Sequence, residues 1–158
     1  MMKRFTTLVL GMCLLLVAVV AQERKDTKKQ APDVENRLAG REYRIDALCA
    51  YPMSGPSVML SAQYSLRMAK DSVYVYLPYY GRAYSQPYGG GEGLIFRGKA
   101  EAYTQKAQKK GRYDISFSVR TQEDSYAFRL SVFKTGEASI SVTMDRKQPI
   151  SFTGNMAF

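Results

Sequence analysis

The stretch RYDISFSVR, residues 112–120, and the next one, SYAFRLSVF, residues 125–133, decide the fold class. In both stretches every second residue is apolar, and the residues between are mostly polar or charged. A period of two is typical of a β-strand with one buried face. The connection between them, residues 121–124, is far too short for a crossover helix. We therefore expect the two strands to be antiparallel neighbours.

The same alternation recurs along the chain from Arg41 onward and predicts about eight strands, separated by turns rich in Gly, Lys and Asp. Their apolar faces fall within residues 43–49, 58–68, 73–77, 94–103, 113–119, 126–132, 138–144 and 150–152. We expect one all-β domain over residues 41–158. Its antiparallel strands should form a meander that closes into a small lipocalin-like barrel or a strongly bent sandwich, because one-sided strands must bury their apolar faces.

Alternation alone does not say whether the apolar faces point into or out of the barrel. The chain ends in Phe158, preceded at two-residue steps by Met156 and Gly154, which resembles the terminal strand of outer-membrane barrels. Against this, the apolar run before Pro78 is shorter than the ~9–11 residues of a membrane-spanning strand. Half of the tyrosines also fall within residues 74–88 instead of forming two girdles. The inward arrangement is favoured, with a small outer-membrane barrel as the alternative.

Residues 1–21, MMKRFTTLVLGMCLLLVAVVA, have a basic start, an apolar run over residues 8–20 and small residues at the end. This pattern predicts a secretory signal peptide cleaved between Ala21 and Gln22. The apolar run is shorter than the ~20 residues that a spanning helix needs, so no transmembrane helix is expected in the mature chain. Cys13 lies inside the run and not at its end, which disfavours a lipoprotein. We expect an exported protein of the periplasm or cell envelope.

Two segments precede the strands. Residues 22–32 lack apolar periodicity and are expected to be a flexible spacer. Residues 33–40 suit a short helix, because Val34 and Leu38 share one face and Gly40 follows. The spacer with its short helix therefore covers residues 22–40.

The composition excludes several chemistries. There is no His, hence no imidazole base, no Ser-His-Asp triad and no His-ligated metal. No Gly-x-Ser-x-Gly elbow or pair of carboxylates across a cleft is evident. The glycine run before Glu92 lacks the spacing of a phosphate loop. We expect no catalytic residue, metal site or cofactor, and no enzyme activity.

The chain is basic, with 23 Lys and Arg against 14 Asp and Glu. Removal of residues 1–21 takes away two of the basic residues and leaves 137 residues with a charge of about +7. Nucleic acid is not expected as a partner of an exported protein, so a basic turn over residues 106–112 is interpreted as solvated. Cys49 would be the single remaining Cys, which rules out an internal disulfide in the mature chain. We expect its thiol to be buried as a small apolar group.

The run DSVYVYLPYYGRA, residues 71–83, resembles the LPYxGRA signature of a secreted bacterial family catalogued as domain of unknown function 4251. Similar stretches occur at residues 93–96, 111–117, 132–138 and 150–154, so that the resemblance covers about residues 40–155. It implies export, to the periplasm of Gram-negative gut bacteria, and no established activity. It carries over no catalytic residue.

The connection over residues 77–93, LPYYGRAYSQPYGGGEG, is the candidate site. Its length exceeds the usual hairpin loop, and loops this long are often functional. Tyrosine suits sugar rings and apolar ligands, and arginine suits a carboxylate or phosphate. The candidate ligand-binding residues are Tyr79, Tyr80, Arg82, Tyr84 and Tyr88.

Two interpretations of this loop stay open. In one, the tyrosines contact an apolar or glycan-like ligand; in the other, the loop plugs the open end of the barrel and its tyrosines are core residues. The sequence thus predicts an exported, non-enzymatic envelope protein of unknown role that binds such a ligand. The alternative is a structural or interaction protein that binds another envelope protein.

Overall fold

The computed structural model describes residues 33–82 and 93–158. The predicted signal peptide with its cleavage site at Ala21 and Gln22, the spacer over residues 22–32, and the candidate residues Tyr84 and Tyr88 lie outside the described residues. A short helix over residues 33–39 and a single 3-10 turn, Lys109–Gly111, accompany nine strands. The strands are β1 Glu42–Pro52, β2 Val58–Ala69, β3 Ser72–Leu77, β4 Leu94–Lys99, β5 Glu101–Ala107, β6 Arg112–Arg120, β7 Ser125–Phe133, β8 Glu137–Met144 and β9 Ile150–Met156.

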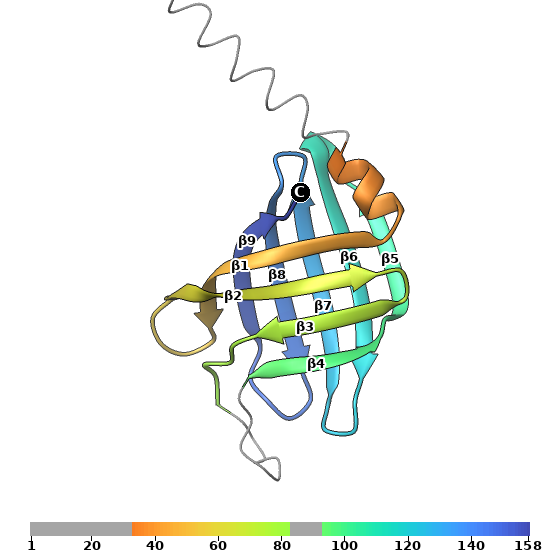
Figure 1. The fold of residues 1–158 in the computed structure, drawn as a ribbon. Helices are drawn as coiled ribbons and strands as arrows, with labels where there is room; N and C mark the ends of the chain where they lie inside the picture. Colours follow the sequence, from red (N-terminus) through yellow and green to blue (C-terminus); the bar gives the residue numbers. More distant parts are fainter. Residues whose placement is uncertain (1–32, 83–92) are drawn as a thin grey trace, which may run out of the picture.

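All nine strands belong to one antiparallel sheet in the order β4-β3-β2-β1-β9-β8-β7-β6-β5. The predicted meander is confirmed, and the pairing of β1 with β9 joins its two ends. We call β1–β4 the first arm and β5–β9 the second arm. The first arm crosses the second at a steep angle (Figure 1), so that the sheet folds over on itself into a nearly closed barrel. Its free edges are β4 and β5.

The expected strand over residues 94–103 is divided in two at Ala100. The Ala100 N–H donates to the Asp71 carbonyl at 2.8 Å, and the chain then leaves β3 and runs on beside β6. Just before this bend, β4 passes close over β6: a Cβ added to Gly98 would overlap a methyl group of Val119. No Pro, Asn or Asp marks the bend in residues 98–102, GKAEA, which is why one strand was predicted instead of two.

The two arms join at a bulge in β1. The register of β1 shifts between Ala47 and Cys49 against both β2 and β9, and the intervening Leu48 is exposed. Opposite the bulge, a Cβ added to Gly154 would overlap the backbone carbonyl of Asp46. The absence of a side chain at Gly154 is therefore what allows β9 to approach β1 here.

The apolar side chains point into the barrel, as the favoured interpretation predicted. Strand β6, for example, buries Tyr113, Ile115, Phe117 and Val119, while the alternate residues face outward. This arrangement is the reverse of the lipid-facing apolar band of an outer-membrane barrel. The largest fully buried side chains are Phe128, Phe152, Leu38, Ile45, Leu66, Met68, Leu77, Leu94, Ile115, Leu130, Ile140 and Ile150.

Aromatic rings of the first arm stack on aromatic rings of the second arm inside the barrel. The Phe96 ring of β4 stacks on the Tyr126 ring of β7 with centroids 4.2 Å apart. The Phe117 and Phe128 rings stack at 5.0 Å beneath them. These stacked rings belong to the apolar core that the two arms share.

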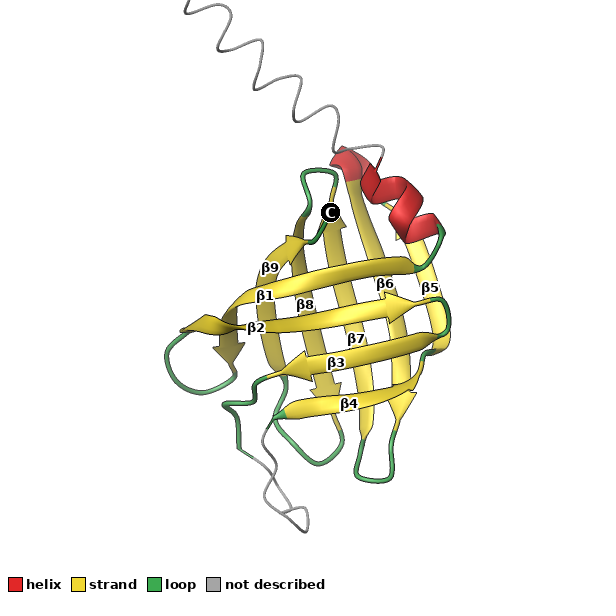
Figure 2. Cartoon of the chain, viewed as in Figure 1, coloured by secondary structure: helices red, strands yellow, loops and turns green. Residues whose placement is uncertain are grey.

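The predicted helix is present and lies over one end of the barrel (Figure 2). Val34 and Leu38 are both fully buried against the core, and Arg37 pairs with Asp33 at 3.3 Å on the outer side. A helix of two turns is marginal alone, so this packing holds it. In residues 33–82 and 93–158, no helix is long and apolar enough to cross a membrane.

Candidate functional site

The predicted loop leaves the barrel at the end of β3, and Tyr79 is tied to the turn between β8 and β9. Its hydroxyl lies 2.9 Å from the Arg82 carbonyl and 3.0 Å from the Gln148 carbonyl. The Lys147 ammonium lies 5.5 Å from the centre of the Tyr79 ring. Tyr79 thereby connects two loops that are far apart in sequence, and its hydroxyl is committed to contacts within the chain.

The backbone of Arg82 strengthens the same connection. Its carbonyl accepts from the Gln148 N–H at 3.0 Å, and its N–H donates to the Gln148 side-chain oxygen at 3.3 Å. Gly81 leaves room for the Tyr79 ring, because a Cβ there would overlap the Tyr79 hydroxyl. The contacts of Tyr79 are those that the plug interpretation describes. Tyr80 and Arg82 instead present exposed side chains at the surface, and ligand contact by them stays a prediction.

A second set of aromatic and charged residues lies on the outer face of the first arm, where the sequence interpretation placed no site. The strand register sets four side chains in one row across the sheet. Arg44 of β1 is opposite Arg67 of β2, Arg67 is opposite Tyr74 of β3, and Tyr74 is opposite Arg97 of β4. We call these four residues the arginine row.

Tyr74 lies between two arginines of this row. The Arg67 guanidinium is 5.4 Å and the Arg97 guanidinium 5.0 Å from the centre of its ring, within the range of cation–π contact. Arg44 has a carboxylate partner, Asp46, at 2.6 Å. Among the described residues, neither Arg67 nor Arg97 has a carboxylate within 4.0 Å. Two guanidinium groups are therefore held in place on a ring, and no carboxylate of residues 33–82 or 93–158 pairs with them.

The next row along the same strands is apolar at its centre. Tyr76 is directly opposite Ile95 on β4 and Ser65 on β2. Tyr76 is 47% and Ile95 51% exposed, so both offer apolar surface to a partner. The Tyr64 ring stacks against Tyr76 at 5.3 Å and limits its freedom. The spacing of two residues along a strand places this row ~7 Å from the arginine row.

The sequence contained a signal for this face. Val73, Val75 and Leu77 alternate inward, so Tyr74 and Tyr76 must point outward on the same strand. Two outward tyrosines on a strand of six residues are unusual surface residues, but the sequence interpretation assigned them to the family signature alone. The arginines come from three other strands, and only the register brings them together, so no pattern within one strand indicates them.

Each arm has a groove on its outer surface. One of about 500 Å³ runs between the helix and the start of the first arm and includes Arg37, Glu42, Arg44 and Arg67. The other, of about 380 Å³, lies on the second arm beside Lys106, Asp114, Ser116 and Arg129. The first groove is continuous with the arginine row through the two residues that they share.

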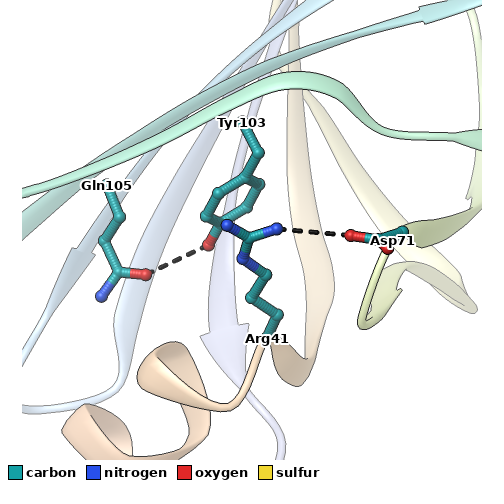
Figure 3. Close-up of polar contacts among 4 residues, drawn as sticks. All are labelled: Arg41, Asp71, Tyr103 and Gln105. Atoms are coloured by element: carbon teal, nitrogen blue, oxygen red, sulfur yellow. Dashed lines mark hydrogen bonds and ion pairs between the residues drawn. The ribbon is translucent and has the colours of Figure 1, made fainter.

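The seam between β5 and the first arm holds a small polar cluster (Figure 3). Arg41 stacks on the Tyr103 ring at 4.3 Å and pairs with Asp71 at 3.3 Å, while the Tyr103 hydroxyl donates to Gln105 at 3.2 Å. Beneath it, the Tyr43 hydroxyl is buried and has no hydrogen-bond partner of good geometry among the described residues. Burial raises the pKa of Tyr43 well above its ordinary value, and the nearby Tyr103 hydroxyl adds to the effect.

Four tyrosines in the described part of the chain have a raised pKa. Burial is the first cause for Tyr43, Tyr103, Tyr113 and Tyr126, and it raises the pKa of Tyr126 to about 12. A phenol shifted this way stays protonated at neutral pH, so it is a poor general base. Cys49 is buried and free, as expected. In residues 33–82 and 93–158, no three Cys, Asp or Glu side chains gather as a metal site.

Comparison with known proteins found a matching family model and similar solved structures. The model of the family described as "Domain of unknown function (DUF4251)" matches residues 25–156. A crystal structure of a DUF4251 family protein from Bacteroides eggerthii DSM 20697 superposes with a TM-score of 0.64 at 15% sequence identity. That likeness covers 80% of this chain and 86% of the other and shows a shared fold. No curated protein matches significantly in sequence. Because the family model spans most of its length, including the LPYxGRA segment that suggested the resemblance, the chain belongs to the DUF4251 family.

Proposed function

We propose that this chain is an exported, non-enzymatic protein of the bacterial envelope that binds an acidic glycan on the outer face of its first arm. The observation that carries the proposal is the arginine row, in which Arg67 and Arg97 flank Tyr74 without a carboxylate partner in the described chain. The apolar pair Tyr76 and Ile95 lies beside it.

The chemistry of a sugar acid suits these two rows. A guanidinium group presents its donors in a planar fork that matches a carboxylate or a sulfate. The flat face of a tyrosine offers apolar contact to the C–H face of a sugar ring at low entropic cost. A sugar resting on Tyr76 would have its acidic group within reach of the arginine row, given a row spacing of ~7 Å.

The exposure of the side chains supports a site on the outer face. Tyr74, Tyr76 and Ile95 are exposed and accessible to a ligand. The candidate residue Tyr80 is 44% exposed and Arg82 is also at the surface, so the predicted loop can contribute to binding. Burial raises the pKa values of Tyr43 and Tyr126, so neither phenol is suited to act as a general base at neutral pH.

Binding is tested by calorimetry with oligogalacturonate as the acidic glycan and dextran as the neutral one. We expect binding of the acidic glycan only, weakened at least tenfold in Arg67→Ala/Arg97→Ala. The matched control is Arg129→Ala, because Arg129 is an exposed arginine on the outer face of the second arm. Equal loss in the control would contradict the proposal, because it would indicate attraction to net charge alone.

A protein partner is the second candidate, since tyrosine and arginine are also enriched at protein interfaces. An oligo-glutamate peptide in the same calorimetry separates the two. Equal or tighter binding of the peptide would favour an interaction protein over a glycan-binding one.

Export is tested separately, by fractionating cells that express the full chain and sequencing the N-terminus of the recovered protein. We expect a periplasmic or envelope fraction that begins at Gln22. A cytoplasmic protein that retains residues 1–21 would contradict this part of the proposal.

A further inference from the structure

The hairpin between β1 and β2 ends in a tip that carries no charge. The charged residues nearest in sequence are Asp46 and Arg67, and all twenty residues between them are uncharged, in a chain of which 23% is charged. We call residues 51–59, YPMSGPSVM, the hairpin tip. Its lack of charge removes the largest cost of moving a protein segment out of water.

The tip exposes large apolar side chains. Met59 is 79% exposed, Met53 68% and Tyr51 44%. Leu48, at the bulge behind the tip, is 47% exposed. Exposed apolar side chains in a contiguous group mark a site of interaction, whereas single ones do not.

The tip projects from the body of the barrel. Figure 1 shows the loop between β1 and β2 extending sideways, apart from the other described loops. A Cβ placed on Gly55 would meet no atom within 4 Å, so the crest of the loop is surrounded by solvent. A convex apolar tip fits poorly against a flat protein surface and better into a deformable surface such as a lipid bilayer.

The backbone of the tip is also suited to a medium with little water. Pro52 and Pro56 have no N–H group, so two donors that would have to be desolvated are missing. Tyr51 has the amphipathic character that favours the headgroup region of a bilayer. The charge of about +7 that remains without residues 1–21 attracts the chain to an anionic surface from a distance.

From these observations we infer that the hairpin tip inserts into the surface of an anionic lipid bilayer, at the depth of the headgroups and the first methylenes. Met53 and Met59 would enter the acyl boundary, and Tyr51 would stay at headgroup level. The association would be peripheral and reversible, because one hairpin tip buries little apolar area. This inference rests on the tip and on the net charge of the chain, and it does not require the proposed glycan site.

The chain contains no Trp, so a single introduced Trp reports on the tip without background. Met53→Trp is purified after export, its N-terminus is sequenced, and it is titrated with vesicles of phosphatidylglycerol and phosphatidylethanolamine. We expect a blue shift of its emission and quenching by brominated lipid. Phe133→Trp is the control, since Phe133 is an exposed aromatic at the end of β7 in the second arm, and it should show neither.

Two further comparisons complete the test. Met59→Ser added to Met53→Trp should weaken vesicle binding about tenfold, the effect of losing one buried apolar side chain. Vesicles of phosphatidylcholine alone should bind more weakly than the anionic ones.

An unshifted emission of the Met53→Trp variant on anionic vesicles would overturn the inference. So would a blue shift that grows with protein concentration in the absence of lipid, because it would assign the tip to a second copy of the chain. Equal binding to phosphatidylcholine alone would overturn the choice of an anionic surface.

Discussion

The outer faces of the two arms differ sharply, although their inner faces share one core. The second arm is covered mainly by hydroxyl side chains, whereas the first arm carries the arginine row and the Tyr76–Ile95 pair. Among the described residues, eight of the ten exposed large hydrophobic side chains fall within residues 48–95, in the first arm and its loops. The outward hydroxyl residues of the second arm are Thr104, Ser116, Ser118, Ser125, Ser131, Ser139, Ser141, Thr143, Ser151 and Thr153.

Packing does not explain this difference, because outward residues on both arms are equally free of the core. A face of short hydroxyl residues keeps a sheet solvated and offers little apolar or charged surface to a ligand. Exposed Tyr, Arg and Ile are instead the residues that supply binding energy. This difference between the outer faces is the reason why the proposed glycan site is placed on the first arm.

The largest expected effect comes from breaking the junction between the arms. Gly154→Ala should lower the free energy of unfolding by about 4 kcal/mol, because its Cβ would displace the Asp46 carbonyl and separate β9 from β1. Urea unfolding monitored by circular dichroism measures the loss. Gly40→Ala is the control, since its Cβ would come no closer than 3.4 Å to any atom beyond its chain neighbours. A Gly154→Ala protein as stable as the control would show that the junction tolerates a side chain.

The crossing of β4 over β6 is the second contact between the arms. Gly98→Ala should cost about 2–3 kcal/mol, because its Cβ would overlap Val119, which is fully buried. Adding Val119→Ala should recover part of that loss, because it removes the methyl group in the way. The double variant should be more stable than the sum of the two single losses predicts, by about 1 kcal/mol. Strict additivity would mean that the two residues do not meet.

High pH should weaken the packing of β4 on β7, where the Phe96 ring stacks on the Tyr126 ring. Burial, followed by Asp124 and Glu123, raises the pKa of Tyr126 to about 12, from 10 in the unfolded chain. The unfolded state then loses its proton first, so the stability that Tyr126 contributes is intact below pH 10 and falls as the pH rises toward 12. The loss should approach about 2 kcal/mol.

Urea unfolding at several pH values between 9 and about 11.5 checks this, in the wild type and in Tyr126→Phe. The variant keeps the ring that stacks on Phe96 but has no proton to lose. Its stability should therefore fall less steeply with pH than that of the wild type. Parallel curves would contradict the assignment to Tyr126.

Tyr79 distinguishes a structural role from ligand binding at the loop beside the first arm. Tyr79→Phe removes the hydroxyl that lies between the Arg82 and Gln148 carbonyls, and should cost about 1 kcal/mol of stability. Tyr80→Phe, at an exposed neighbour, should leave stability within error. Glycan affinity of Tyr79→Phe should equal that of the wild type once the protein is folded. A loss of affinity at full stability would assign Tyr79 to the ligand.

The sequence predicted the second arm more completely than the first. Strands β6–β8 alternate without interruption and are joined by short turns, so their limits, order and buried faces follow from local pattern. The prediction was less complete at the two ends of this arm, because β5 was not separated from β4 and β9 continues to Met156. The first arm depends on contacts that no local pattern contains: the bulge at Leu48, the bend at Ala100 and the pairing of β1 with β9. The candidate loop was located correctly between β3 and β4, but its Tyr79 is bonded to Gln148, sixty-nine positions away. The arginine row was missed for the same reason, because register between strands is not visible in any one strand.

The smallest expected effect is a gain in stability on removal of one charge from the arginine row, and it tests the difference between the two outer faces directly. Arg67 is directly opposite Arg44, and like charges in that position destabilise a sheet. Arg67→Gln should therefore raise stability by about 0.3 kcal/mol at low salt, and the gain should vanish at high salt as the repulsion is screened. Arg129→Gln has Ser116 and Ser141 opposite it and should give no such gain. Thermal unfolding in low and high salt measures both. If Arg67→Gln stabilises the fold and weakens glycan binding, the side chain serves binding at a cost in stability. If Arg67→Gln destabilises the sheet at both salt concentrations, the arginine row has a structural role instead.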